Sequence, residues 1–203
     1  MNRPKISLPA TVLGLVAGAI VGWPGASLLA SIHFLNSGES KNGWSYYLTF
    51  GRNEPPTLAA ASSAKHGMFA HLPEEAVYFI GSGDASRGQA YTLHFDDDEF
   101  PVVGAFWSLT MYLDELPYNL VANPIDRFVI SDRTPGIQFG DDGSLDIYIQ
   151  HDPPKEAHKA SNWLPAPDGP FRMLLRTYIT GEAIRDGSYA PPPVQLASTS
   201  GRR

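Results

Sequence analysis

The N-terminal part of the chain contains a long stretch without any ionisable side chain, from residue 6 to residue 32. A helix rises about 1.5 Å per residue, so a helix over this stretch would reach roughly 40 Å and could cross a bilayer core of about 30 Å. The sequence therefore predicts one membrane helix that holds the rest of the chain at a membrane surface. No catalytic or metal motif of real specificity follows it, so the sequence predicts a location rather than a chemistry.

A cleaved secretory signal is the alternative interpretation of this segment. Such a signal has a basic start, an apolar region of about 7–15 residues and small residues at the cleavage site. The basic start is present, but the apolar run is longer than that of a usual signal, which favours a retained anchor.

The orientation of the anchor follows from the charges that flank it. Arg3 and Lys5 precede the span, whereas Glu39 and Lys41 follow it and cancel each other. Positive charge is retained on the cytoplasmic side of a membrane. We therefore expect a single-pass protein of the cell inner membrane, with a cytoplasmic N-terminus and its main domain in the periplasm.

Small residues recur at every fourth position of the apolar segment, among them Gly14, Gly18 and Gly22. This spacing forms a stripe on one helix face that lets two backbones approach closely. It predicts a homo-oligomer through the membrane helix. The alternative is that glycine is simply common in membrane helices.

Pro24 lies late in the segment. Either the helix continues past Pro24 with a kink, or Trp23 marks the membrane interface.

Composition limits the class of protein and its partners. The formal net charge is −6 and no basic stripe appears, which argues against nucleic acid as a partner. Cysteine is absent, so there is no disulfide framework and no thiol chemistry. We expect a membrane anchor at residues 1–35, a connector at 36–54, a β-sandwich domain at 55–190 and a disordered tail at 191–203.

The remaining chain reads mainly as β structure. An alanine-rich run after two prolines predicts a helix over residues 57–69, and a short helix is expected at 182–185. Asp-Gly at 142–143 predicts a hairpin between residues 137–139 and 145–150. Alternating runs predict further strands at 76–81, 91–95, 106–112, 127–131 and 171–179. Strands separated by turns indicate a mainly β fold, an antiparallel β-sandwich that is jelly-roll-like, with one N-terminal transmembrane helix and one or two short helices.

Six phrases occur in the sequence in a characteristic order: EAVYF at 75–79, FWSLTMY at 106–112, NPIDR at 123–127, DGSL at 142–145, SNWLPAP at 161–167 and LRTY at 175–178. Together they resemble a bacterial family, the domain of unknown function called twelve-fourteen, which often follows a partner domain called twelve-fifty-four. The resemblance covers residues 43–194 and implies a β-sandwich. It also implies a short, single-pass form without the partner domain, so an activity that needs both domains is not expected. The family supplies no catalytic residues to carry over.

Aromatic and polar side chains in the predicted strands and in the loop before residue 170 are candidate ligand-binding residues. Aromatic faces with a few directed polar groups suit sugars and other amphipathic ligands. The alternative is that the tryptophans fill the core and the arginine pairs with a carboxylate. The candidates are Trp107, Asn162, Trp163, Arg176 and Tyr178.

His151 ends a predicted strand and is a further candidate, since His151-Asp152 could supply an acid and a base. A surface histidine is the alternative. No histidine spacing matches a metal motif, and the acidic run at 96–99 lacks the calcium-loop pattern. We therefore expect no metal and no cofactor. The absence of a nucleophile elbow and of glycine-rich phosphate loops also argues against serine hydrolases and nucleotide enzymes.

The leading hypothesis is a membrane-anchored envelope protein whose non-catalytic β-sandwich binds a ligand or partner, such as a glycan, a lipid or an envelope protein. The alternative is an enzyme that acts on carbohydrate or another small envelope molecule with Asp and His side chains around Trp163. Two carboxylates about 5–10 Å apart across one cleft would distinguish the enzyme. For that role the sequence offers Asp132, Asp146 and Asp152.

Overall fold

The computed structural model describes residues 8–36, 38–48, 71–115 and 118–197. The chain divides into two compact units, residues 1–37 with 50–70 and residues 38–49 with 71–203. Each unit is described by itself. The helix predicted at 57–69 lies outside the described residues.

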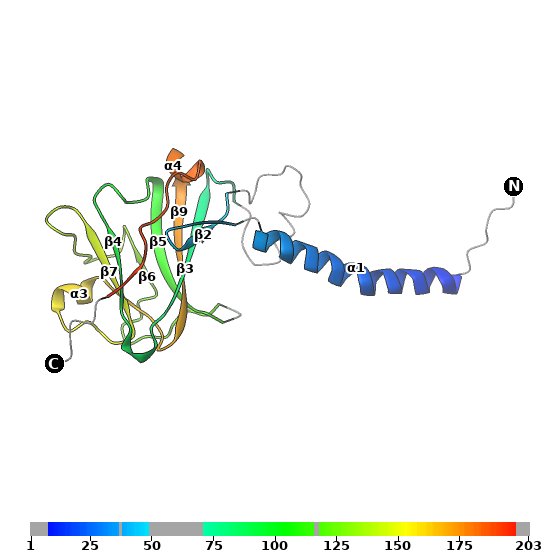
Figure 1. The fold of residues 1–203 in the computed structure, drawn as a ribbon, viewed down its shortest axis with the longest axis horizontal. Helices are drawn as coiled ribbons and strands as arrows, with labels where there is room; N and C mark the ends of the chain where they lie inside the picture. Colours follow the sequence, from blue (N-terminus) through cyan, green and yellow to red (C-terminus); the bar gives the residue numbers. More distant parts are fainter. Residues whose placement is uncertain (1–7, 37, 49–70, 116–117, 198–203) are drawn as a thin grey trace. The chain divides into compact units, whose positions relative to one another are not determined.

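The first unit contains α1, Leu8–Asn36, a 29-residue helix with Pro24 inside it (Figure 1). Residues Val12–Leu29 are long and apolar enough to cross a membrane, and none of this window is buried in the protein. A signal sequence near an N-terminus can also be long and apolar enough to meet this criterion. Added Cβ atoms on Gly14, Gly18 and Gly22 would meet nothing within 4 Å, so the stripe is open.

The second unit is built from two β-sheets (Figure 1). The larger sheet has six strands, all paired antiparallel. In spatial order they are β1 (Glu39–Lys41), β2 (Trp44–Tyr46), β3 (Ala76–Asp84), β9 (Pro170–Thr180), β5 (Val103–Leu113) and β6 (Val129–Ser131).

The smaller sheet has four strands and is mixed, because its last two strands run parallel. Short helical segments are η1 (Ser86–Gly88), α3 (Ala157–Ser161) and α4 (Glu182–Arg185). The sheet's strands, in spatial order, are β10 (Gln195–Leu196), β4 (Tyr91–Phe95), β7 (Leu145–Gln150) and β8 (Trp163–Pro165). A mainly β fold of two sheets with few helices confirms the fold class expected from the sequence.

One continuous apolar core includes residues of both sheets. Period-two alternation explains it, because alternate side chains of a strand point to the same face. Leu145, Ile147 and Ile149 of β7 are completely buried in this core. The rings of Tyr91 on β4 and Phe171 on β9 lie 5.6 Å apart, so the two sheets meet directly.

The predicted hairpin around Asp142-Gly143 is only half correct. The turn forms, with the Gly140 amide donating to the Ser144 carbonyl over 2.8 Å and Gly143 at φ +84°. However, residues 137–139 form no strand, because β7 already pairs with β4 on one side and β8 on the other. Without a free edge to pair with, Gln138 hydrogen-bonds the side chain of Asn162.

Two predicted boundaries also differ from the structure. The expected connector at 36–54 contains β1 and β2, and Trp44 and Tyr46 of β2 are buried in the core. The expected disorder from Pro191 is not found up to residue 197, since β10 pairs with β4. The indole N–H of Trp44 donates to the Pro192 carbonyl, which explains why a proline-rich segment is held.

Candidate functional site

Trp107 is a core residue rather than part of a binding cleft. Its side chain is only 4% exposed. It packs against two phenylalanines, with ring centroids 5.9 Å from Phe95 and 6.3 Å from Phe100. An aromatic residue on the core-facing side of β5 fills volume between the sheets and offers no surface to a ligand.

Asn162 and Trp163 hold the loop that crosses to β8. The Asn162 carboxamide accepts from the Gln138 amide over 2.8 Å and donates to the Gln138 carbonyl over 2.6 Å. The Trp163 indole donates to the Gln150 carbonyl over 2.9 Å. Both side chains are buried, so their polar groups are used internally.

Two further residues, Arg127 and His151, contact the backbone of the same region. Arg127 Nη1 lies within 2.9–3.2 Å of three carbonyl oxygens, those of Ala160, Ser161 and Trp163. His151 Nδ1 lies 3.2 Å from the Ala166 carbonyl. The structure therefore gives the predicted site residues of this region a positioning role within the fold.

Arg176 and Tyr178 are brought together on the outer face of the six-stranded sheet. They alternate with core residues along β9, and neighbouring strands place further aromatic and basic groups beside them. Arg176 pairs in register with Tyr78 of β3, and Tyr178 with Phe106 of β5. We call this surface the tyrosine–arginine face; it consists of Tyr78, Phe106, Tyr112, Arg172, Arg176 and Tyr178.

Arg176 lies at the centre of this face, where two hydroxyl groups and two tyrosine rings surround its guanidinium. Nη1 donates to Thr110 Oγ1 over 2.9 Å and Nη2 donates to the Tyr112 hydroxyl over 2.8 Å. Its guanidinium carbon lies 5.7 Å from the ring centroids of both Tyr78 and Tyr112. Within the described part of the chain, no carboxylate forms an ion pair with it.

The aromatic side chains of the face pack in a row. Tyr178 stacks on Phe106 with centroids 4.6 Å apart and meets the edge of Tyr78 at 6.2 Å. Arg133 lies over the other side, 4.6 Å from the Phe106 centroid. Burial and a hydrogen bond with Tyr178 raise the pKa of the Tyr78 phenol, so this group stays protonated at neutral pH.

Arg172 lies on the same face, and its charge is neutralised by a carboxylate, that of Asp114. Its Nη2 lies 2.8 Å and its Nε 3.0 Å from Asp114 Oδ1. Its guanidinium also covers Tyr118, at 4.9 Å from the ring centroid. A carboxylate therefore pairs with Arg172, whereas none in the described part of the chain pairs with Arg176.

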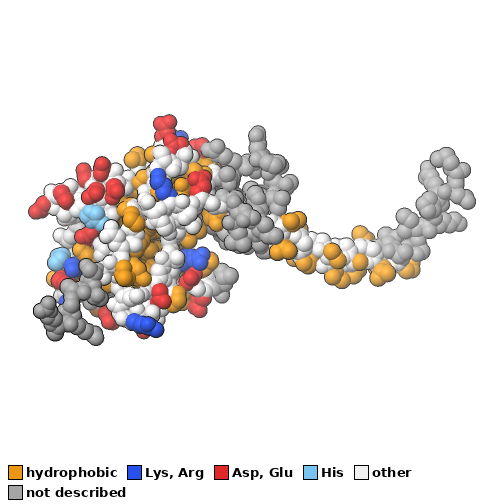
Figure 2. Space-filling view, in the orientation of Figure 1, with side chains coloured by type: hydrophobic (Ala, Val, Ile, Leu, Met, Phe, Trp, Pro, Cys, Tyr) orange, Lys and Arg blue, Asp and Glu red, His pale blue; other side chains and the backbone are white. Residues whose placement is uncertain are grey.

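A second polar cluster lies on the four-stranded sheet, where Figure 2 shows acidic side chains gathered near a histidine. His94 Nδ1 lies 2.7 Å from Asp146 Oδ1, and its Nε2 lies 3.1 Å from Asp96 Oδ1. The Tyr148 hydroxyl donates to Asp146 Oδ2 over 3.1 Å. The hydrogen bond with Asp146, assisted by Asp96, raises the pKa of His94.

This cluster links β4 to β7 and is poorly arranged for proton transfer to a substrate. A catalytic histidine needs one ring nitrogen facing the substrate, whereas both nitrogens of His94 face carboxylates. His94 is not among the site residues predicted from the sequence. The available signal was its outward position in the alternating strand 91–95.

The carboxylates proposed for an enzyme do not meet in one cleft. Asp146 lies near the start of β7 and Asp152 beyond its end, so a rise of about 3.3 Å per residue puts the backbone of Asp146 roughly 13 Å from the end of the strand that leads to Asp152. Asp132 follows β6 in the other sheet. Within the described residues, no cluster of three or more histidines, cysteines and acidic residues could hold a metal ion.

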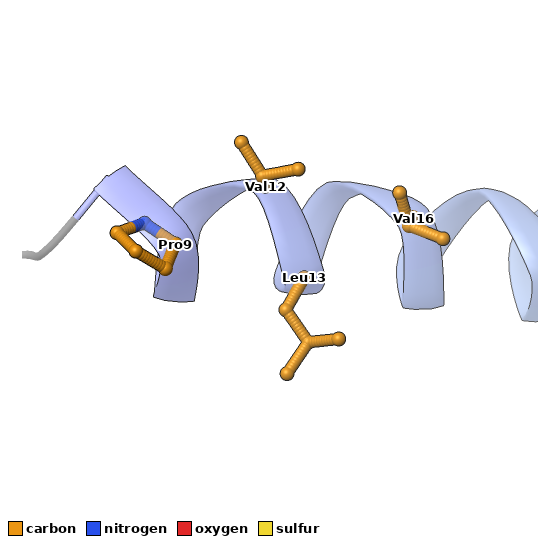
Figure 3. A pocket seen from close by; sticks show the side chains of 4 residues that line it. All are labelled: Pro9, Val12, Leu13 and Val16. Atoms are coloured by element: carbon orange, nitrogen blue, oxygen red, sulfur yellow. The ribbon is translucent and has the colours of Figure 1, made fainter.

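A shallow apolar depression lies on the first turns of α1, where Figure 3 shows Pro9, Val12, Leu13 and Val16 around it. All four residues come from one helix and carry no polar side-chain group. The depression therefore offers nothing to orient a polar ligand.

Comparison with known proteins identifies the family. The sequence model of a family described as "Protein of unknown function (DUF1214)" matches residues 75–182, more than half of the chain. This confirms the resemblance inferred from the six phrases. Among curated proteins, none matches the chain.

Two crystal structures match the chain, and the first of them has a similar fold. The VPA0106 protein of Vibrio parahaemolyticus matches with a TM-score of 0.65 and 23% identity, over 97% of this chain and 47% of that one. A putative uncharacterised protein of Burkholderia cenocepacia matches with a TM-score of 0.41 and 13% identity, over 99% and 46%. The chain thus spans about half the length of these structures.

Proposed function

Because the chain belongs to the DUF1214 family, whose function is unknown, we propose its function from its own geometry. The protein is a membrane-anchored component of the bacterial envelope, and its extracytoplasmic β-sandwich binds an anionic ligand or partner at the tyrosine–arginine face. The anchor is α1, retained in the inner membrane, with Arg3 and Lys5 on the cytoplasmic side.

The observation that carries this proposal is that no described carboxylate pairs with Arg176. A guanidinium has five N–H donors in a planar fork that matches carboxylate and phosphate groups. Two neutral hydroxyls, on Thr110 and Tyr112, hold the fork in place. The remaining N–H groups of this part-buried cation are available to an external anion, which would supply the acidic partner that no described residue supplies.

The tyrosines around Arg176 support the same function. Tyr78 and Tyr178 present rings with polar tips, which suit amphipathic ligands that carry both an apolar surface and hydroxyl or acidic groups. Acidic glycans, lipids and acidic protein surfaces all have this chemistry. The enzyme alternative has less support, because its carboxylates are dispersed and Trp163 is buried.

The experiment is a titration of the full chain in detergent micelles with acidic and neutral oligosaccharides, followed by NMR signals of the arginine side chains. We expect acidic sugars to shift Arg176, and Arg176→Gln to weaken binding at least about tenfold, as loss of a charge-assisted hydrogen bond does. Arg185→Gln on α4 is the matched control and should leave affinity unchanged. Equal loss in both variants, or no binding of any anion, would contradict the proposal.

A further inference from the structure

The point at which the chain enters the sandwich adjoins the tyrosine–arginine face. Tyr46 pairs with Phe79, and continuation of this antiparallel register places Tyr47 beside Tyr78. Gly38 contacts Tyr47 closely, since a Cβ on Gly38 would lie 2.8 Å from Tyr47 Cε1. Gly38, which precedes β1, is therefore separated by the single strand β2 from β3, whose Tyr78 pairs with Arg176 of β9.

The link from α1 to this point is very short. The helix ends at Asn36, and only Ser37 separates it from Gly38. Consecutive residues are at most about 3.8 Å apart, so Gly38 stays within roughly 8 Å of the helix end. If α1 spans a membrane, the strands that begin at Gly38 start at the level of the lipid headgroups.

The charges of the domain are unevenly distributed between its two sheets. The outer face of the six-stranded sheet carries Arg133 and Arg176, neither of which has an ion-pair partner among the described residues. Acidic side chains gather instead on the four-stranded sheet beside β4 and β7 (Figure 2). A chain of net charge −6 thereby carries arginines together with tyrosines on the outer face of its larger sheet.

We propose that the tyrosine–arginine face docks on anionic phospholipids of the membrane that holds α1, with Arg176 and Arg133 contacting lipid phosphates. Arginine pairs well with phosphate, and tyrosine is enriched at the headgroup level of membranes. This inference rests on the proposed function, because it names the anion that the face binds. Val102, just before β5, is 70% exposed, and Ile179, near the end of β9, is 59% exposed. These two apolar side chains add surface that lipid can cover.

The test uses the full chain in lipid nanodiscs and a single fluorescent label, which the absence of native cysteine permits. The label is attached at Val129→Cys, an exposed position of β6 on the outer face, or at Asp141→Cys, near the acidic cluster. Quenching by headgroup nitroxides reports proximity to lipid. We expect strong quenching at residue 129 and weak quenching at residue 141 in discs with phosphatidylglycerol, and a smaller difference in purely zwitterionic discs.

Three variants make this test sensitive to charge. Arg176→Gln and Arg133→Gln should each lower the ratio of docked to undocked domain about fivefold, the effect expected for one basic residue near an anionic surface. Asp114→Asn removes the partner of Arg172 and should raise that ratio instead, an increase that a misfolded protein would not produce.

Equal quenching at both labels, or quenching that none of the variants changes, would overturn lipid docking. The proposed function is tested separately in micelles. If acidic sugars bind there through Arg176 while the labels are quenched equally in discs, only the lipid assignment is wrong. If neither is observed, the proposed function and the lipid assignment both fail.

Discussion

Trp44 and Pro192, which are 148 positions apart, are joined by a buried hydrogen bond of 2.9 Å from the indole N–H to the proline carbonyl. The bond connects β2, at the start of the sandwich, to the segment that leads into β10. Trp44 is completely buried, and a Cβ on Gly81 would lie 2.8 Å from its ring. Residues 38–48 and residues 191–197 are therefore parts of one folded unit.

Replacing Trp44 with phenylalanine should destabilise the sandwich. The change leaves the Pro192 carbonyl buried without a donor, which costs about 1–3 kcal/mol, and it removes buried volume as well. Urea denaturation of the full chain followed by near-UV circular dichroism measures the free energy of unfolding. Trp23→Phe in α1, where the side chain is 81% exposed, is the control. Equal effects of the two substitutions would contradict the role given to Trp44.

Trp107→Ala should lower stability by about 3–5 kcal/mol, as expected for removal of a large aromatic side chain from a core. Trp107→Phe should be milder and leave the affinity of the folded protein for anions unchanged. Measuring both unfolding and oligosaccharide binding of these variants separates a role of Trp107 in core packing from a role in ligand binding. A tenfold loss of affinity in Trp107→Phe, at unchanged stability, would show that Trp107 contacts ligand after all.

The His94 cluster predicts a dependence of stability on pH. The pKa of His94 is raised in the folded state by Asp146 and Asp96. Its contribution is therefore fully present below the unfolded pKa of about 6.5 and is lost as the pH rises through the folded pKa. The side chain is 42% exposed, so solvent screening keeps the effect under about 1 kcal/mol.

We expect His94→Asn to destabilise the protein more at about pH 5.5 than at about pH 8.5, because only the acidic condition charges the histidine. Urea denaturation at the two pH values measures this difference. His158→Asn, at an exposed position of α3 away from the His94 cluster, is the control substitution. A larger effect of His94→Asn at the alkaline pH would show that the sign is wrong.

Ile179 has a left-handed backbone conformation, with φ +54°, which is unfavourable for a β-branched residue. Its amide donates to the Glu75 carbonyl over 2.8 Å, which helps to hold this geometry. Because the side chain is 59% exposed, Ile179→Asn loses little burial and should raise stability by about 1 kcal/mol.

Thermal and urea denaturation of Ile179→Asn measure this gain. Val102→Asn is the matched control, since Val102 is an exposed apolar neighbour without a positive φ. A loss of stability in Ile179→Asn, or an equal gain in both variants, would show that strain at Ile179 is not relieved.

The glycine stripe on α1 predicts self-association of the helix in a membrane. Gly18→Leu should weaken it, because the new side chain keeps two backbones apart. Ile20→Ala changes the opposite side of the helix, two residues or about 200° away, and should have little effect. A reporter assay of helix association in membranes compares the two, and unchanged association in Gly18→Leu would rule out the stripe.

The sequence predicted the long strands well because their patterns are local. Alternation of apolar and polar residues identifies β5, β7 and β9 without knowledge of their partners. The strands β1, β2, β8 and β10 have only two or three residues each, too few for a periodic signal. They exist because neighbouring strands and buried contacts such as Trp44–Pro192 hold them.

The site was only partly predictable for the same reason. Arg176 and Tyr178 share a face because they are two residues apart in one strand, which the sequence shows. The hydrogen bond between Tyr112 and Arg176 depends on the register between strands. So does the contact of His94 with Asp146, which is 52 positions away. Tryptophans suit either side of a strand, so Trp107 and Trp163 could not be assigned to core or cleft from their identity.

The strand order of the larger sheet bears on how the chain reaches its native state. β9 lies between β3 and β5, although both precede it in the sequence by more than fifty residues. A chain synthesised from its N-terminus thus holds two long strands with unpaired edges until residue 180 has emerged. Such edges are prone to aggregate, so we expect the nascent protein to need shielding until a single late insertion completes the sheet.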